Sequence, residues 1–296
     1  MVATNGQLSG VLIEDWLAQL RLKILSSAPN LIEIFDLYAS EAKFGRNYIA
    51  TELDKLAPNA EVLEVGAGSL ILSTQLVREG FKLTALEPTG SGFSHFNQLR
   101  EIVMHEAKLS GCMPNLIEVS AESLDISNHF DFAFSVNVME HVNDIELTLI
   151  KVMQSIKAGG EYKFTCPNYV FPYEPHFNIP TVISKSFTEK IFSKRIYSCK
   201  NILDPQGLWD SINWITVPKL RSFAKKNSVI SLKLRTDLFN EMINRTVGDE
   251  EFSKRRSPFI KRLLSLVIKL KVNRLVQHIP AIFQPVIDCS FIKSEQ

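Results

Sequence analysis

The segment with the clearest potential for chemistry is acidic and rich in glycine: Leu63-Glu64-Val65-Gly66-Ala67-Gly68-Ser69-Leu70. It follows a short apolar run and precedes a stretch with the apolar spacing of a helix, so it predicts a turn between a strand and a helix. Glycine lets the backbone turn tightly and lets a ligand approach the main chain, and the first N–H groups of a helix have no partner within it. A nucleotide-like cofactor is therefore expected at this turn.

A second acidic residue, Glu87, ends the next predicted strand, 19 residues after Gly68. A carboxylate at this place can accept hydrogen bonds from both hydroxyls of a ribose. Dinucleotide-binding turns usually carry a third small residue, and here Ile71 occupies that position. The spacing thus favours a nucleoside cofactor and counts against a nicotinamide, although a nicotinamide-dependent oxidoreductase on a related sheet remains the rival enzyme.

Two histidines are candidates for proton transfer, because imidazole titrates near neutral pH. His141 follows Glu140 directly after an apolar run, and His176 ends the segment Tyr173-Glu174-Pro175-His176. We name both as catalytic candidates. The alternatives are that His141 caps the next helix and that His176 is a solvated loop residue.

No metal site is expected from the cysteines. Cys112, Cys166, Cys199 and Cys289 lie far apart, and they form no C-x-x-C pair or Cys/His cluster with the spacing of zinc ligands. The first residues lack the basic start and apolar core of a signal peptide, and no apolar run is long enough to span a bilayer. These features predict a cytoplasmic protein.

The elements that must position these residues form an alternating pattern after two N-terminal helical stretches, 11–28 and 31–56. Strands are expected at Glu61–Val65, Lys82–Leu86, Asn115–Val119, Phe130–Ser135, Glu161–Cys166, Val229–Arg235 and Val286–Ile292. Helices are expected at 70–80, 91–110, 143–157, 186–195 and 217–226. Alternation of strands and helices predicts an α/β fold with a doubly wound, mostly parallel sheet covered on both faces.

The chain is accordingly divided into an N-terminal helical segment (1–57), a cofactor-binding core (58–166) and an acceptor-side region (167–296). Prolines and aromatic residues after Cys166 predict an ordered loop, which follows the carboxyl end of a strand, where ligands bind in such sheets. A mostly helical insertion separates the last two predicted strands.

Residues 58–170 resemble the core of class I S-adenosylmethionine-dependent methyltransferases. The resemblance rests on the glycine turn, on the acid at Glu87 and on the segments Ser120–Leu124 and Asn137–Val142. The resemblance implies a Rossmann-like sheet of seven strands whose last strand is antiparallel. It also implies that S-adenosyl-L-methionine is the cofactor, with Glu87 and Pro88 at its ribose. The other cofactor contacts that it implies are Glu64, Gly66, Ala67 and Gly68 at the methionine and sulfonium groups, Ala121, Glu122 and Ser123 at the adenine, and Asn137 and Val138 in the cofactor cleft.

The function expected from this resemblance is methyl transfer to a small-molecule or lipid- or glycan-linked acceptor, at oxygen. The asparagine-to-histidine loop, 168–176, would help to cover the acceptor. A rival from a different class is a non-catalytic protein that retains the cofactor fold and associates with a membrane or a partner.

The segment 252–287 carries eight basic residues and no acidic one, whereas the whole chain has 33 basic and 32 acidic residues and a net charge of +1. Within it, residues 258–277 have the pattern of a basic amphipathic helix, which can lie on an anionic bilayer or can cover a core or a partner subunit. If the helix lies on a bilayer, it makes a peripheral membrane contact, and this is the contact that we expect. The near-neutral total charge argues against nucleic acid as a partner.

Overall fold

The computed structural model describes residues 12–88, 95–200, 202, 204–254, 256 and 258–295. The chain forms two compact units. The first comprises the described residues up to Ser120 together with His129–Phe134, and the second comprises Ala121–Asn128 and the described residues from Ser135 onward. The division at residues 57 and 166 remains a prediction.

The first unit opens with helices α1 (Ile13–Ser27), α2 (Ile32–Tyr48) and α3 (Ala50–Leu53). A short 3₁₀ turn that begins at Pro29 separates α1 from α2, because proline cannot continue the preceding helix. Apolar residues of α1 that recur at helical spacing, among them Trp16, Leu20 and Ile24, are fully buried. The two predicted N-terminal helical stretches are thus confirmed over the described residues; Val11 lies outside them.

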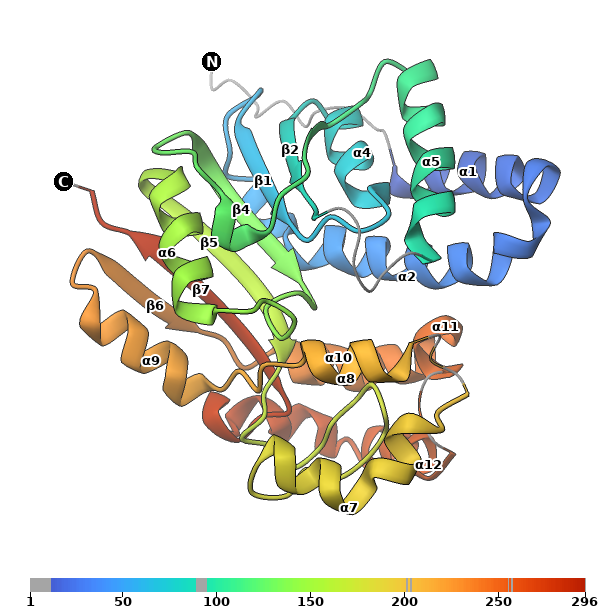
Figure 1. Ribbon diagram of the computed structural model, residues 1–296, viewed down its shortest axis with the longest axis vertical. Coiled ribbons are helices and arrows are strands. Elements are labelled where there is room, and N and C mark those ends of the chain that lie inside the picture. The colour runs from blue at the N-terminus through green and yellow to red at the C-terminus, as the bar shows by residue number, and fades with distance from the viewer. Residues whose placement is uncertain are drawn as a thin grey trace. The chain divides into compact units, whose positions relative to one another are not determined.

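A seven-stranded sheet runs through the described residues in the order β3-β2-β1-β4-β5-β7-β6 (Figure 1). The strands are β1 (Glu61–Val65), β2 (Lys82–Leu86), β3 (Asn115–Ile117), β4 (Phe130–Val136), β5 (Ile156–Pro167), β6 (Ile230–Leu234) and β7 (Val286–Lys293). β1 pairs in parallel with β2 and β4, whereas β7 is antiparallel to both β5 and β6. The predicted mostly parallel sheet with an antiparallel last strand is confirmed.

In the first unit, the helices that follow β1 and β2 are α4 (Ile71–Arg78) and α5 (His95–Leu109). α4 packs against β2 and α2. β1 and β2 are buried along almost their whole length, as expected for parallel strands covered on both faces. Residues 91–94 of the helix predicted at 91–110 lie outside the described residues.

In the second unit, α6 (Ile145–Ser155) leads directly into β5, and α9 (Val217–Lys226) packs along β6, as Figure 1 shows. Between β5 and α9 lie α7 (Lys185–Tyr197) and α8 (Pro205–Ser211). The insertion between β6 and β7 contains α10 (Leu238–Gly248), α11 (Glu250–Lys254) and α12 (Pro258–Lys269), followed by the 3₁₀ helices η3 (Val272–His278) and η4 (Ala281–Phe283). Phe291 of β7 contacts Phe164 of β5 and Phe223 of α9, which builds the core of this unit.

The loop after β5 is ordered, as predicted, because its side chains hold other segments of the second unit. The buried amide Nδ2 of Asn168 donates to the carbonyls of Ala281, Ile282 and Gln284 at 3.4, 3.0 and 2.8 Å. Tyr169 stacks on Trp214 with ring centroids 5.2 Å apart. These contacts fix the start of the loop to the segment that precedes β7.

The prediction of one basic helix over 258–277 is wrong in its length. α12 ends at Lys269, and Lys271 adopts a left-handed conformation (φ 58°) that an α-helix cannot contain. Asn273 then donates from Nδ2 to Oδ1 of Asn240 and of Asn244, both on α10. Among the described residues, no helix combines the length and the apolar character needed to cross a bilayer.

Candidate functional site

The glycine turn of the first unit requires backbone conformations that glycine adopts readily. Gly66 has φ 75° and Gly68 has φ 52°, both in the left-handed region. The N–H groups of Gly66 and Ala67 both donate to the carbonyl of Leu86, at 2.8 and 3.2 Å, and so tie the turn to the end of β2. α4 begins at Ile71, directly after the turn, as the sequence predicts.

Glu87 lies against this turn, at the end of β2. Its Oε2 accepts a hydrogen bond of 2.9 Å from the N–H of Gly68. Burial raises the pKa of Glu87, while the Gly68 hydrogen bond and the charge of Arg100 oppose the rise. The structure thus brings together the two features that sequence spacing associated with a nucleoside cofactor, whereas Pro88 is exposed beside them.

Glu64 is buried in the same unit, where its Oε2 accepts a hydrogen bond from Oγ of Ser73 on α4. Burial raises the pKa of Glu64 to about 8; the Ser73 bond opposes the rise and the nearby charge of Glu87 adds to it. A buried carboxyl group beside a second acid favours a cationic ligand group, because a cation would offset both negative charges. Sequence reasoning did not identify Ser73, although it lies nine residues after Glu64 on the same strand–turn–helix unit.

In the second unit, the residues assigned to the adenine form the 3₁₀ turn Ala121–Ser123. Oε1 of Glu122 accepts hydrogen bonds from the N–H groups of Asn143 and Asp144, at 2.7 and 3.2 Å, just before α6. Asn137 is exposed with φ 55°, and its N–H donates to the carbonyl of Thr165. Cofactor contacts by Ala121, Glu122, Ser123, Asn137 and Val138 remain predictions.

The structure brings the two candidate histidines together in the second unit. The ring centroids of His141 and His176 are 5.3 Å apart, although 35 residues separate them in the chain. Glu140 is fully buried beside them, and its Oε1 lies 3.8 Å from Nε2 of His141. Burial raises the pKa of Glu140 to about 7, against the opposing charge of His176.

His176 is held by Glu174, a buried carboxylate with several donors. Oε1 of Glu174 lies 2.5 Å from Nδ1 of His176, and the N–H groups of His176 and Phe177 also donate to this carboxylate. Burial disfavours charge on both side chains, but their mutual attraction and hydrogen bonds prevail, so the pKa of Glu174 is lowered and that of His176 is raised. His176 is therefore an oriented imidazole and not a freely solvated loop residue.

His141 is oriented by a hydrogen-bond chain to α8. Oγ of Ser211 donates to the carbonyl of Leu208, so the same oxygen accepts from Nδ1–H of His141 at 2.9 Å. Burial and the charges of His176 and Lys185 lower the pKa of His141 to about 3, which keeps the imidazole neutral. Nδ1 thus carries the proton, and Nε2 carries the lone pair on the side of Glu140.

Sequence reasoning missed the residues that hold these imidazoles. Glu174 stands two positions before His176, so its proximity could have been inferred. Ser211 and Asn213 lie about 70 residues after His141, and no local pattern connects them. Nδ2 of Asn213 donates to the carbonyls of Met139 and Val142, both at 2.8 Å, which fixes the backbone turn that carries Glu140 and His141.

Comparison with known proteins identifies the family. Residues 40–175 match the model of a methyltransferase domain family. Over 281 residues the chain is 40% identical to the uncharacterized proteins Rv1509 and MT1557 from two strains of Mycobacterium tuberculosis, and each match covers 95% of both chains. The chain belongs to the S-adenosylmethionine-dependent methyltransferase family. It is thus an enzyme, and S-adenosylmethionine is its cofactor.

Further relatives of this methyltransferase match over shorter lengths or in fold alone. Ubiquinone biosynthesis O-methyltransferase of Rickettsia conorii is 28% identical over 120 residues, which cover 40% of this chain and 37% of that protein. Phosphoethanolamine N-methyltransferase 2 of Haemonchus contortus, solved with phosphomonomethylethanolamine and S-adenosylhomocysteine, superposes with a TM-score of 0.52 at 15% identity, covering 97% of this chain and 61% of that one. This likeness confirms the predicted class I fold.

Proposed function

We propose that this methyltransferase transfers the methyl group of S-adenosylmethionine to an oxygen of a small-molecule or lipid- or glycan-linked acceptor. The main support for cofactor binding by particular residues is the hydrogen bond from the N–H of Gly68 to Glu87. It places a carboxylate next to a turn whose glycines have left-handed backbone conformations. Support for oxygen as the methylated atom comes from the Rickettsia O-methyltransferase relative.

In this proposal Glu87 accepts hydrogen bonds from the ribose hydroxyls, and the turn Gly66-Ala67-Gly68 lies against the methionine part of the cofactor. When bound, S-adenosylmethionine supplies a methyl group already activated by a sulfonium, so orientation of the acceptor contributes much of the rate. Glu64 offers a carboxylate to the cationic groups, whose charge would lower its pKa. His141 and His176 contact the acceptor and act on its hydroxyl proton, and the loop 168–176 helps to cover it.

Calorimetric titration with S-adenosylmethionine and S-adenosylhomocysteine tests the cofactor assignment. Glu87→Ala should weaken both affinities by about tenfold or more, since a charge-assisted pair of hydrogen bonds is lost. Glu118→Ala, which removes an exposed acid just after β3, should leave them unchanged. Equal affinity in Glu87→Ala and the wild type would refute the role of Glu87. If the wild type bound NAD and neither sulfur ligand, the oxidoreductase alternative would replace the proposal.

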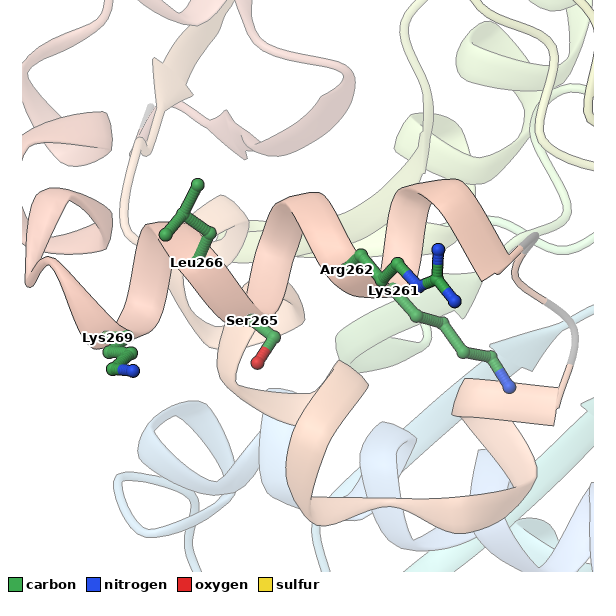
Figure 2. A pocket seen from close by; sticks show the side chains of 5 residues that line it. All are labelled: Lys261, Arg262, Ser265, Leu266 and Lys269. Atoms are coloured by element: carbon green, nitrogen blue, oxygen red, sulfur yellow. The ribbon is translucent and has the colours of Figure 1, made fainter.

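The surface of α12 supports a membrane-associated acceptor. No residue of α12 is buried. Three of its apolar side chains, at helical spacing, are exposed: Phe259 by 74%, Leu263 by 49% and Leu266 by 51%. Leu270, directly after the helix, is exposed by 63%. Basic residues line the neighbouring side, where Lys261, Arg262, Ser265, Leu266 and Lys269 border a depression of about 420 Å³ (Figure 2). In the view of Figure 2, the side chain of Leu266 lies above the ribbon of α12 and those of Ser265 and Lys269 lie below it.

We infer that α12 lies on a bilayer that contains anionic lipids. An exposed apolar stripe flanked by cations is the pattern of an interfacial helix: the apolar side chains enter the acyl boundary and the cations meet the headgroups. α12 contacts α10, which holds the helix on the enzyme. All four cysteines are free, which supports the cytoplasmic face of the membrane as the location.

Vesicle co-sedimentation of the full chain tests this surface. The double variant Leu266→Ser, Leu270→Ser should bind phosphatidylcholine–phosphatidylglycerol vesicles at least about tenfold more weakly than the wild type, because two apolar anchors are lost. The matched control is Leu22→Ser, Leu25→Ser on α1, whose side chains are 70% and 43% exposed. Equal loss in both double variants, or no binding by the wild type, would overturn the membrane assignment.

A further inference from the structure

Glu140, His141 and His176 form a cluster whose geometry suits a metal ion. Each side chain offers one ligand atom, and the three atoms lie within 4.8 Å of one another. Glu140 is fully buried, and neither of its carboxylate oxygens has a hydrogen-bond partner among the described residues. A buried carboxylate oxygen without a donor is unfavourable, and a cation among these three side chains would remove that cost.

Both imidazoles are oriented as in metal sites. Nδ1 of His176 lies 2.5 Å from Oε1 of Glu174, and Nδ1–H of His141 donates to Ser211 at 2.9 Å. Metal-bound histidines almost always donate their second ring N–H to a carboxylate or another oxygen, which fixes the tautomer and the ring plane. In each of these two residues, the contact at Nδ1 leaves Nε2 as the nitrogen that can coordinate an ion.

We propose that Glu140, His141 and His176 bind a divalent first-row transition-metal ion such as Zn²⁺, Co²⁺ or Fe²⁺. Two imidazoles and one carboxylate are the ligand set that such ions prefer, whereas Mg²⁺ and Ca²⁺ prefer oxygen alone. Ligand atoms around a tetrahedral Zn²⁺ with bonds of about 2.1 Å lie about 3.4 Å apart. The 3.8 Å between Oε1 of Glu140 and Nε2 of His141 is close to that separation.

Three protein ligands leave at least one coordination position open, as in catalytic and not in structural metal sites. An acceptor hydroxyl bound there would lose its proton more easily. The oxygen–methyl bond then forms as the sulfur–methyl bond breaks, and the hydroxyl proton passes to solvent. With an ion bound, His141 and His176 act on that proton through the ion and do not accept it themselves. This role of the ion in deprotonating the acceptor rests on the proposed function, in which the methylated atom is oxygen. Binding of the ion does not depend on that proposal.

Metal binding is measured directly on the full chain, freed of metal by a chelator. Calorimetry with Zn²⁺, together with the visible absorption of added Co²⁺, should show binding of about one ion per chain and no comparable binding of Mg²⁺. Glu140→Gln and His176→Ala should each weaken binding by about tenfold or more, because each loses a ligand. His129→Ala, which removes a half-exposed histidine of the first unit, should bind like the wild type.

Titration of the same variants with S-adenosylhomocysteine and their melting temperatures show whether they fold. Absence of Zn²⁺ and Co²⁺ binding in the wild type would overturn the metal site, as would undiminished binding in folded Glu140→Gln and His176→Ala. Failure of the cofactor assignment would be seen separately, as loss of S-adenosylmethionine binding with ion binding intact.

Discussion

Glu64 shows how one buried carboxyl group couples the cofactor turn to pH. Its pKa is about 8 in the folded protein, against 4.5 for the ordinary side chain, because burial disfavours the charged form. The folded state therefore holds this proton more tightly than the unfolded chain does. The stability contribution of Glu64 is fully present below about pH 4.5 and is lost as pH rises through 8.

Glu64→Gln should remove this part of the pH dependence, since glutamine stays neutral and its carbonyl can still accept from Ser73. In thermal unfolding without cofactor, the free energy of unfolding of the variant should rise relative to that of the wild type as the pH increases from 5 to 9. The gain is on the order of a few kcal/mol, at about 1.4 kcal/mol for each unit of pKa shift. Glu33→Gln, at an exposed site on α2, is the control. Parallel pH profiles for Glu64→Gln and the wild type would contradict the shifted pKa.

The individual site residues differ in how far the sequence could predict them. Glu87 and Gly68 were predictable, because a strand, a turn and a helix set their spacing within one supersecondary unit. The proximity of His141 and His176 was not, since it depends on the path of the loop after β5. Ser211 lies about 70 residues from the imidazole that it orients. Such contacts arise from tertiary packing and leave no periodic signal.

At the level of elements, the sequence predicted β1 and β2 at their observed limits, because each is a short, mostly apolar segment that alternates with a helical stretch, as in parallel sheets. β5 was predicted too short. It begins at Ile156, five residues before Glu161, and the intervening Gly159 and Gly160 obscured the strand pattern.

Short and capped helices were harder to predict. α8 has seven residues and was not expected; it begins with a proline, and Asp204 accepts from the N–H of Gly207 as its N-cap. The basic helix was expected to run to residue 277 because its apolar spacing continues past Lys271. Its end depends on a left-handed lysine and on the contacts of Asn273 with α10, which periodicity does not encode.

The charge of the whole molecule is unevenly distributed along the chain. Eight of the 33 basic residues and none of the 32 acidic residues lie in 252–287, so the remaining chain carries 25 basic and 32 acidic residues, a net charge of −7. The total of +1 hides this asymmetry. An anionic surface would attract the segment 252–287 and repel the rest, so the proposed membrane contact would place α12 toward the bilayer.

Binding to anionic vesicles should therefore follow the local charge of α12 and not the net charge of the molecule. Lys269→Glu and Lys225→Glu change the total charge equally, but Lys269 lies on α12 and Lys225 on α9. Each cation near an anionic surface contributes about 1 kcal/mol, so Lys269→Glu should weaken binding at low salt by at least about fivefold, and Lys225→Glu should not. Because the Debye length falls to about 8 Å at physiological ionic strength, this difference should shrink as sodium chloride is added. Equal weakening by the two substitutions would show that net charge alone governs binding, and the oriented contact of α12 would have to be abandoned.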